Sequence, residues 1–210
     1  EFTAKEKLPI IELGSNWKID SWTNLTFSNL QFNGEYQYKL FVKRSAPSFY
    51  NCILNNCRLD INFCRDVVIE NCIVKGQDSK PGVKLFKSAG AFITKNYITE
   101  CCNGVELNTS IDVSLIGNEI TSCLESGLYL YVSTVKITKE NSFSENKKGV
   151  TVATRSGGNF IRNQFFENVI AIKLHDRESH SLTDFKDNHF IGNKIISNSR
   201  IVLESTSDLM

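Results

Sequence analysis

Asparagine recurs along this chain at an almost constant interval, each time two residues before a large apolar residue. The seven positions are Asn51, Asn71, Asn96, Asn118, Asn141, Asn163 and Asn188, with spacings of 20, 25, 22, 23, 22 and 25 residues. The residues two places further on are Ile53, Ile73, Ile98, Ile120, Phe143, Phe165 and Phe190. Such a pattern is typical of a solenoid, in which one short structural unit stacks on the next.

Within each repeat, an apolar–polar–apolar triplet follows a turn residue, often glycine. The triplets are Val83–Leu85, Val105–Leu107, Leu128–Leu130, Val150–Val152, Ile172–Leu174 and Ile201–Leu203, and Gly82, Gly104, Gly127 and Gly149 precede the first four. Alternating polarity over so few residues predicts short β-strands. No segment shows a helical period, and the middle residue of each triplet is expected to point outward.

A repeat this short cannot bury its own apolar face, so the coils are expected to stack about 4.8 Å apart. The sequence therefore predicts an all-β, single-domain, right-handed parallel β-helix of about eight coils. The asparagines would form an amide ladder along the rod, with the isoleucines and phenylalanines stacked behind them. We expect an N-terminal cap and a degenerate first coil in residues 1–45, the repeats in residues 46–203 and a tail in residues 204–210.

The repeat resembles the pectin lyase-like superfamily of right-handed β-helices. The resemblance is best in the segment Ile111–Ile120 and in Gly127–Leu130, which follows it. Such repeats occur in NosD-type proteins, in F-box β-helix proteins and in carbohydrate-active enzymes, and the chain also looks like the Nessun dorma-type interaction domains. The resemblance implies the fold and leaves the activity open.

Bulk composition excludes several classes of function. The net charge of +1 gives no excess of basic residues to attract nucleic acid, and no apolar run has the length of about 20 residues that spans a membrane. The seven cysteines are an odd number, which favours free thiols in a reducing compartment, and we therefore expect a cytoplasmic location. Two glycosylation tripeptides, at Asn24 and Asn108, argue weakly for an extracellular one.

The middle residues of the triplets predict an outward ladder of Lys84, Glu106, Tyr129, Thr151 and Lys173. A second ladder, two residues further along, would hold Phe86, Asn108, Tyr131, Ala153 and His175. Aromatic rings beside amides and charges suit a protein interface, where tyrosine is enriched, and they also suit a sugar. A third interpretation is a solvated sheet surface with favourable neighbours, such as Lys84 opposite Glu106.

Catalytic and metal sites are not expected. Glycoside hydrolysis needs two carboxylates about 5–9.5 Å apart, and no acid pair occupies equivalent positions of adjacent coils in the predicted register. The densest polar group is Lys173, His175, Asp176 and Arg177, and the histidines lack the spacing of metal ligands. No cofactor is expected, because no glycine-rich phosphate loop is present.

The leading hypothesis is a non-catalytic scaffold that binds a protein partner through the ladders. The alternative is a carbohydrate-binding or polysaccharide lyase-like protein that acts on an extended glycan, and a trimeric fibre segment is a third possibility. In-register coils would also place Cys52 beside Cys72, and Cys101 beside Cys123, within disulfide range. Buried thiols that pack as small apolar residues are the simpler interpretation of both pairs.

Overall fold

The computed structural model describes residues 8–21, 24–34, 38–76, 79–175 and 182–197. These residues form 26 short β-strands, and the described part of the chain contains no helix. It therefore has no helix that could span a membrane. The all-β prediction is confirmed.

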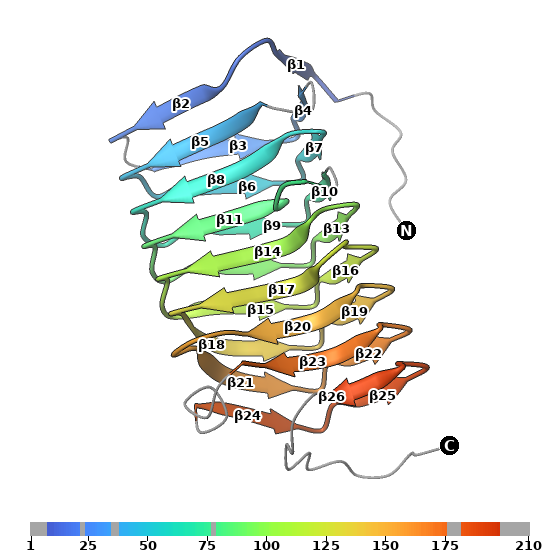
Figure 1. Ribbon diagram of the computed structural model, residues 1–210. Coiled ribbons are helices and arrows are strands. Elements are labelled where there is room, and N and C mark those ends of the chain that lie inside the picture. The colour runs from blue at the N-terminus through green and yellow to red at the C-terminus, as the bar shows by residue number, and fades with distance from the viewer. Residues whose placement is uncertain (1–7, 22–23, 35–37, 77–78, 176–181, 198–210) are drawn as a thin grey trace.

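The strands form three parallel sheets that run the length of the molecule (Figure 1). The first sheet holds β1 (Ile10–Leu13), β4 (Gln31–Gly34), β7 (Ile53–Asn55), β10 (Ile73–Lys75), β13 (Tyr97–Thr99), β16 (Glu119–Thr121), β19 (Ser142–Ser144), β22 (Gln164–Phe166) and β25 (His189–Ile191). The second sheet holds β2 (Trp17–Asp20), β5 (Lys39–Lys43), β8 (Arg58–Asn62), β11 (Val83–Phe86), β14 (Asn103–Asn108), β17 (Ser126–Tyr131), β20 (Lys148–Val152), β23 (Ile170–Leu174) and β26 (Ile195–Ser197). The third sheet holds β3 (Leu25–Ser28), β6 (Pro47–Tyr50), β9 (Val68–Glu70), β12 (Phe92–Thr94), β15 (Val113–Ile116), β18 (Thr134–Lys139), β21 (Gly157–Ile161) and β24 (Thr183–Lys186).

Each coil of the solenoid contributes one strand to each sheet. Each strand therefore pairs with the strand three places later in the chain, as β1 does with β4. The predicted parallel β-helix of about eight coils is confirmed, with eight or nine strands in each sheet. The chain bends between sheets at residues in the left-handed region, such as Lys95 with φ 55° and Ser122 with φ 54°. Strands β1 to β5 already pair within the three sheets, and the division of the chain at residue 45 stays a prediction.

Polar side chains at the corners link successive coils. Where the third sheet meets the first, Asn118 accepts a hydrogen bond from the backbone N–H of Asn96 at 3.0 Å and one from its side-chain amide at 2.9 Å. The same contacts join the ladder Asn96, Asn118, Asn141, Asn163 and Asn188. A second asparagine ladder, of Asn146, Asn168 and Asn193, follows the next corner, and Ser88, Ser110, Ser133 and Ser156 form the third. The predicted amide ladder therefore exists over five of its seven rungs.

The first two rungs were predicted one residue out of register. Cys72, and not Asn71, donates its backbone N–H to Asn96 at 2.8 Å, and Cys52 donates to the Cys72 sulfur at 3.4 Å. Asn51 and Asn71 lie one residue earlier in left-handed conformations and bond to each other outside the core, at 2.6 Å. The inner stack consequently continues through Leu54 and Val74, while Ile53 and Ile73 lie on the outer face.

Six of the seven cysteines are buried, at positions that asparagine or serine occupies in later coils. Cys64, for example, takes the corner position of Ser88. All seven cysteines are free thiols, and Cys102 alone is partly exposed. The Cys72 side chain holds the pKa of the Cys52 thiol at about 7, whereas burial raises the pKa of Cys57 to about 12.

Apolar side chains from all three sheets fill the interior of the rod. The predicted aromatic stack is confirmed: the rings of Phe143 and Phe165 lie 5.3 Å apart, and those of Phe165 and Phe190 lie 5.1 Å apart. The last predicted triplet, Ile201–Leu203, lies outside the described residues. Its place is taken by β26, since Ser197 pairs with Ile172. In the final coil, the strand of the second sheet therefore comes earlier in the chain than the repeat pattern predicted.

Candidate functional site

The outer side of the second sheet, here called the ladder face, carries polar residues in register from coil to coil. Its central ladder runs Lys18, Phe41, Asp60, Lys84, Glu106, Tyr129, Thr151 and Lys173. The predicted order from Lys84 to Lys173 agrees with the strand register. Three further members, Asp60, Phe41 and Lys18, precede it because β8, β5 and β2 belong to the same sheet.

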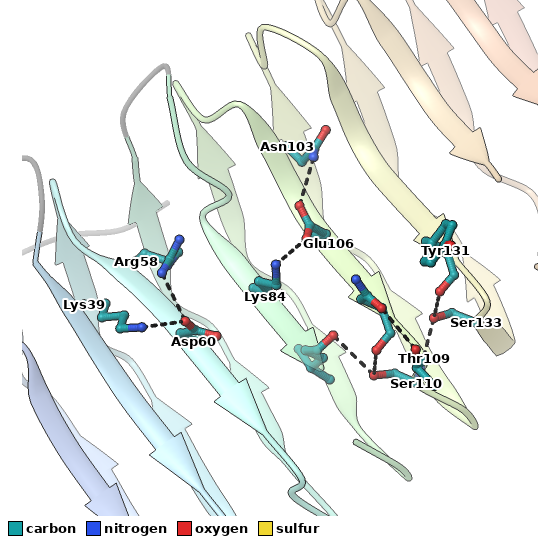
Figure 2. A network of polar contacts seen from close by, with 12 residues as sticks. Lys39, Arg58, Asp60, Lys84, Asn103, Glu106, Thr109, Ser110, Tyr131 and Ser133 are labelled. Atoms are coloured by element: carbon teal, nitrogen blue, oxygen red, sulfur yellow. Dashed lines mark hydrogen bonds and ion pairs between the residues drawn. The ribbon is translucent and has the colours of Figure 1, made fainter. Parts of the chain in front are cut away.

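Asp60 is the most buried acid of this face, with only 5% of its surface exposed. Its Oδ2 accepts hydrogen bonds from Lys39 Nζ at 3.2 Å and from Arg58 at 3.1 Å (Figure 2). A buried carboxylate is costly unless it is paired, and these two cations supply the pairing. The sequence interpretation missed Asp60, Lys39 and Arg58, because arginine stands where later coils have the marker glycine.

Glu106, two coils further along, makes a second cluster. It forms an ion pair with Lys84 at 2.8 Å and accepts a hydrogen bond from Asn103 at 3.2 Å (Figure 2). The expected pairing of Lys84 with Glu106 is therefore confirmed. Lys84 lies between Asp60 and Glu106 in the ladder, so the two carboxylates are not on adjacent coils.

Four buried polar atoms of this face have no hydrogen-bond partner: Asp60 Oδ1, Arg58 Nε, Asn62 Oδ1 and Asn103 Oδ1. They are four of the five such atoms among the described residues, and the fifth is Thr138 Oγ1. An unpaired buried polar atom costs about 1–3 kcal/mol, so such atoms are few in folded proteins. Four of these atoms therefore lie close to the two ion-pair clusters of the ladder face.

Two tyrosines continue the face beyond Glu106. Tyr129 follows Glu106 in the central ladder and is half-buried, while Tyr131 follows Asn108 in the second ladder and is 41% exposed. Burial and the neighbouring Glu106 carboxylate raise the pKa of the Tyr129 phenol. Tyr129 therefore keeps its proton at neutral pH and can donate a hydrogen bond.

A hollow of about 500 Å³ opens at one end of the ladder face. Its lining includes Tyr38, Lys39, Arg58, Asn56 and Lys80. Its volume lies within the range of about 300–1,000 Å³ that is usual for ligand pockets. Three cationic side chains border it, and two of them also hold Asp60.

Some of the remaining predicted site residues lie near the Lys84–Glu106 pair, and others lie farther along the rod. Phe86 and Asn108 lie in register on adjacent coils beside the Lys84–Glu106 pair. Lys173 is two coils beyond Tyr129, separated from it by Thr151, which is buried and bonded to Ser126 at 2.8 Å. The second ladder was wrong at Ala153, which is buried, although His175 beyond it is exposed.

The polar group predicted around Lys173 extends to Asp176 and Arg177, which lie outside the described residues, as does His180. His189 begins β25 on the first sheet, opposite Gln164. Within the described ranges, no three His, Cys, Asp or Glu side chains are grouped to hold a metal ion.

Two solved structures and one sequence family are similar to this chain. No curated protein matches the sequence. Among solved structures, the mannuronan C-5 epimerase AlgE4 A-module of Azotobacter vinelandii is similar, with a TM-score of 0.47 and 9% identity over 95% of this chain and 81% of that one. The periplasmic alginate epimerase AlgG has a TM-score of 0.48 and 12% identity over 90% of this chain and 74% of that one.

The sequence itself matches the family described as the right handed beta helix region, over residues 14–166. This match covers most of the chain and gives the hand of the solenoid that the repeat predicted. The chain belongs to the right-handed β-helix family.

Proposed function

We propose that the ladder face binds a carbohydrate chain. The observation that carries this proposal is the row of polar side chains that Asp60, Lys84, Glu106 and Tyr129 form in register on successive coils. The carboxylates of this row accept hydrogen bonds, its ammonium and phenol groups donate them, and sugar hydroxyl groups do both. The likeness to solved structures supports the fold alone.

The geometry suits an extended ligand better than a compact one. Successive rungs repeat about every 4.8 Å, so Asp60, Lys84, Glu106 and Tyr129 present a row of donors and acceptors along the rod. The Tyr131 ring is available to cover the apolar side of a sugar. The hollow beside Lys39, Arg58 and Lys80 suits a negatively charged substituent at one end.

A protein partner is the second candidate. It is favoured by aromatic exposure at the edge of the ladder face, where Phe86 contacts Phe63, whose surface is 45% exposed. The closer comparison with F-box and Nessun dorma-type domains stays a prediction. Catalysis is not part of either proposal.

A glycan-array measurement tests the carbohydrate proposal. The ladder variant combines Lys84→Met with Glu106→Gln, which removes one ion pair from the face. The matched control combines Lys95→Met with Glu70→Gln, which removes the exposed Lys95–Glu70 pair of the third-sheet side. We expect wild type and control to bind the same sugar class and the ladder variant to bind about tenfold more weakly, a change of about 1.4 kcal/mol. A blank array from folded wild-type protein, or equal binding by all three proteins, would overturn the proposal.

A further inference from the structure

A second hollow, of about 450 Å³, lies at the corner between the second and third sheets. Phe63, Arg65, Lys87, Thr109 and Ile111 are among its lining residues. It shares no lining residue with the hollow at Lys39 and Arg58, and it belongs to a different edge of the second sheet. It is here called the Phe63 corner.

Phe63 is a large apolar residue exposed at this corner. It is 45% exposed, and its backbone has φ 55°. Bulky residues are uncommon in this region, and Phe63 is the only aromatic residue with positive φ among the described residues. Asparagine would meet the backbone requirement of this bend at lower cost. The equivalent residues of neighbouring coils, such as Lys87 and Thr109, share this conformation, so the exposed ring and not the bend distinguishes this coil.

The arrangement around the ring decides which kind of ligand fits. The ammonium groups of Lys43 and Lys87 each lie 5.6 Å from the centre of the Phe63 ring. The Phe86 ring meets it edge to face at 5.5 Å. Cations and a second ring therefore border Phe63, and the hollow beside it has both apolar and cationic lining. Ile111, 51% exposed, adds an aliphatic wall suited to an apolar side chain.

The charge around the Phe63 corner is positive. No carboxylate among the described residues forms an ion pair with Lys43, Arg65 or Lys87. Asp66 and Asp112 are near in sequence, but they do not line the hollow. Three cations around an apolar depression are complementary to an apolar residue flanked by acids.

We propose that the Phe63 corner docks an acidic polypeptide segment, with one aliphatic or aromatic side chain inserted between Phe63 and Ile111. Carboxylates on either side of that residue meet Arg65, Lys87 and Lys43. This site is separate from the carbohydrate site, so either can exist without the other.

Selection from a phage-displayed random peptide library on the whole chain tests this inference. We expect enriched peptides to carry an apolar residue flanked by Asp or Glu. Synthetic peptides of these sequences should bind Phe63→Asn at least tenfold more weakly, and a Lys43→Gln, Lys87→Gln double variant should lose affinity to a similar extent. The control is Phe92→Thr, which removes another exposed phenylalanine, 48% exposed on the third sheet, and should leave the affinity unchanged.

The double lysine variant keeps the test decisive if Phe63→Asn fails to fold. The inference is wrong if no peptide is enriched, if the enriched peptides lack acidic residues, or if their affinity survives the lysine substitutions. It is also wrong if heparin or a thymidine 20-mer binds the Phe63 corner in a lysine-dependent way while the peptides do not.

Discussion

At the scale of single residues, this fold depends on small polar side chains at the corners. Asn118 shows the principle: its amide donates to Ile93 O at 2.8 Å and to Asn141 at 2.8 Å, while its oxygen accepts from Asn96. One buried side chain thereby supplies hydrogen-bond partners to backbone N–H and C=O groups that have no strand partner at the corner. Cysteine replaces asparagine at equivalent corners because a thiol has a similar size and is a weak donor.

Replacing Asn118 by alanine should lower the free energy of unfolding by about 2–4 kcal/mol, because the Asn96 N–H and the Ile93 carbonyl both lose a buried partner. Denaturant titration measures the change. The control Asn159→Ala removes an exposed amide that donates one hydrogen bond, to Lys136 O at 3.3 Å. This substitution should lower the free energy of unfolding by less than about 0.5 kcal/mol. Equal losses in both variants would contradict this account of the ladder.

The sequence predicted this ladder correctly from Asn96 onward, because five asparagines stand at the same corner. It failed at Cys52 and Cys72, since neighbouring asparagines at 51 and 71 imitate the ladder residue. The candidate site was predicted from Lys84 onward and missed at Asp60 for a related reason. Arg58, the first residue of β8, stands where later coils have glycine, so the triplet pattern could not mark Asp60.

At the scale of elements, close packing between coils explains the glycines before the triplets. A Cβ atom on Gly127 would lie 2.7 Å from the Gly149 carbonyl oxygen and 2.9 Å from the Phe143 ring. Both distances are shorter than real contacts allow, so alanine requires a backbone shift. These glycines, near the start of β14, β17 and β20, permit the backbone there to approach the next coil closely.

Gly127→Ala should therefore destabilise the fold by about 1–3 kcal/mol, seen as a lower melting temperature. Gly14→Ala provides the control, because a Cβ there would meet nothing within 4 Å. A Gly127→Ala protein as stable as Gly14→Ala would show that the coils can separate without cost.

Ion pairs between coils add a stability that depends on pH. Hydrogen bonds from Lys147 and Lys148, each 2.6 Å long, lower the pKa of Glu125 to about 2 from its usual 4.5. A depressed carboxyl pKa stabilises the folded state fully above the usual value, and this contribution disappears as the pH falls from about 4.5 to about 2. The Glu125 side chain is 40% exposed, so its contribution is at most about 1 kcal/mol.

The melting temperature of Glu125→Gln should accordingly be below that of wild type at pH 7, and the difference should close as the pH falls through about 2. Thermal unfolding followed by circular dichroism across this range measures the difference. A difference in melting temperature that stays constant with pH would contradict this role of the ion pairs between Glu125 and the two lysines.

At the scale of the whole molecule, the repeat determines the architecture and leaves the function to the surface. Similar coils place residues of similar position in continuous rows, so the ladder face and the Phe63 corner are each assembled from several coils. A repeat pattern predicts such rows, but it cannot predict which buried atoms remain without a partner. That information depends on side-chain contacts such as those of Arg58 and Asn103.

The most direct test of the carbohydrate proposal is a crystal structure of the chain soaked with the oligosaccharide that the glycan array identifies. We predict sugar density along the second sheet, with hydroxyl groups within hydrogen-bond distance of the Lys84, Glu106 and Tyr129 side chains. Sugar bound on the first or third sheet, away from these three side chains, would contradict the proposal.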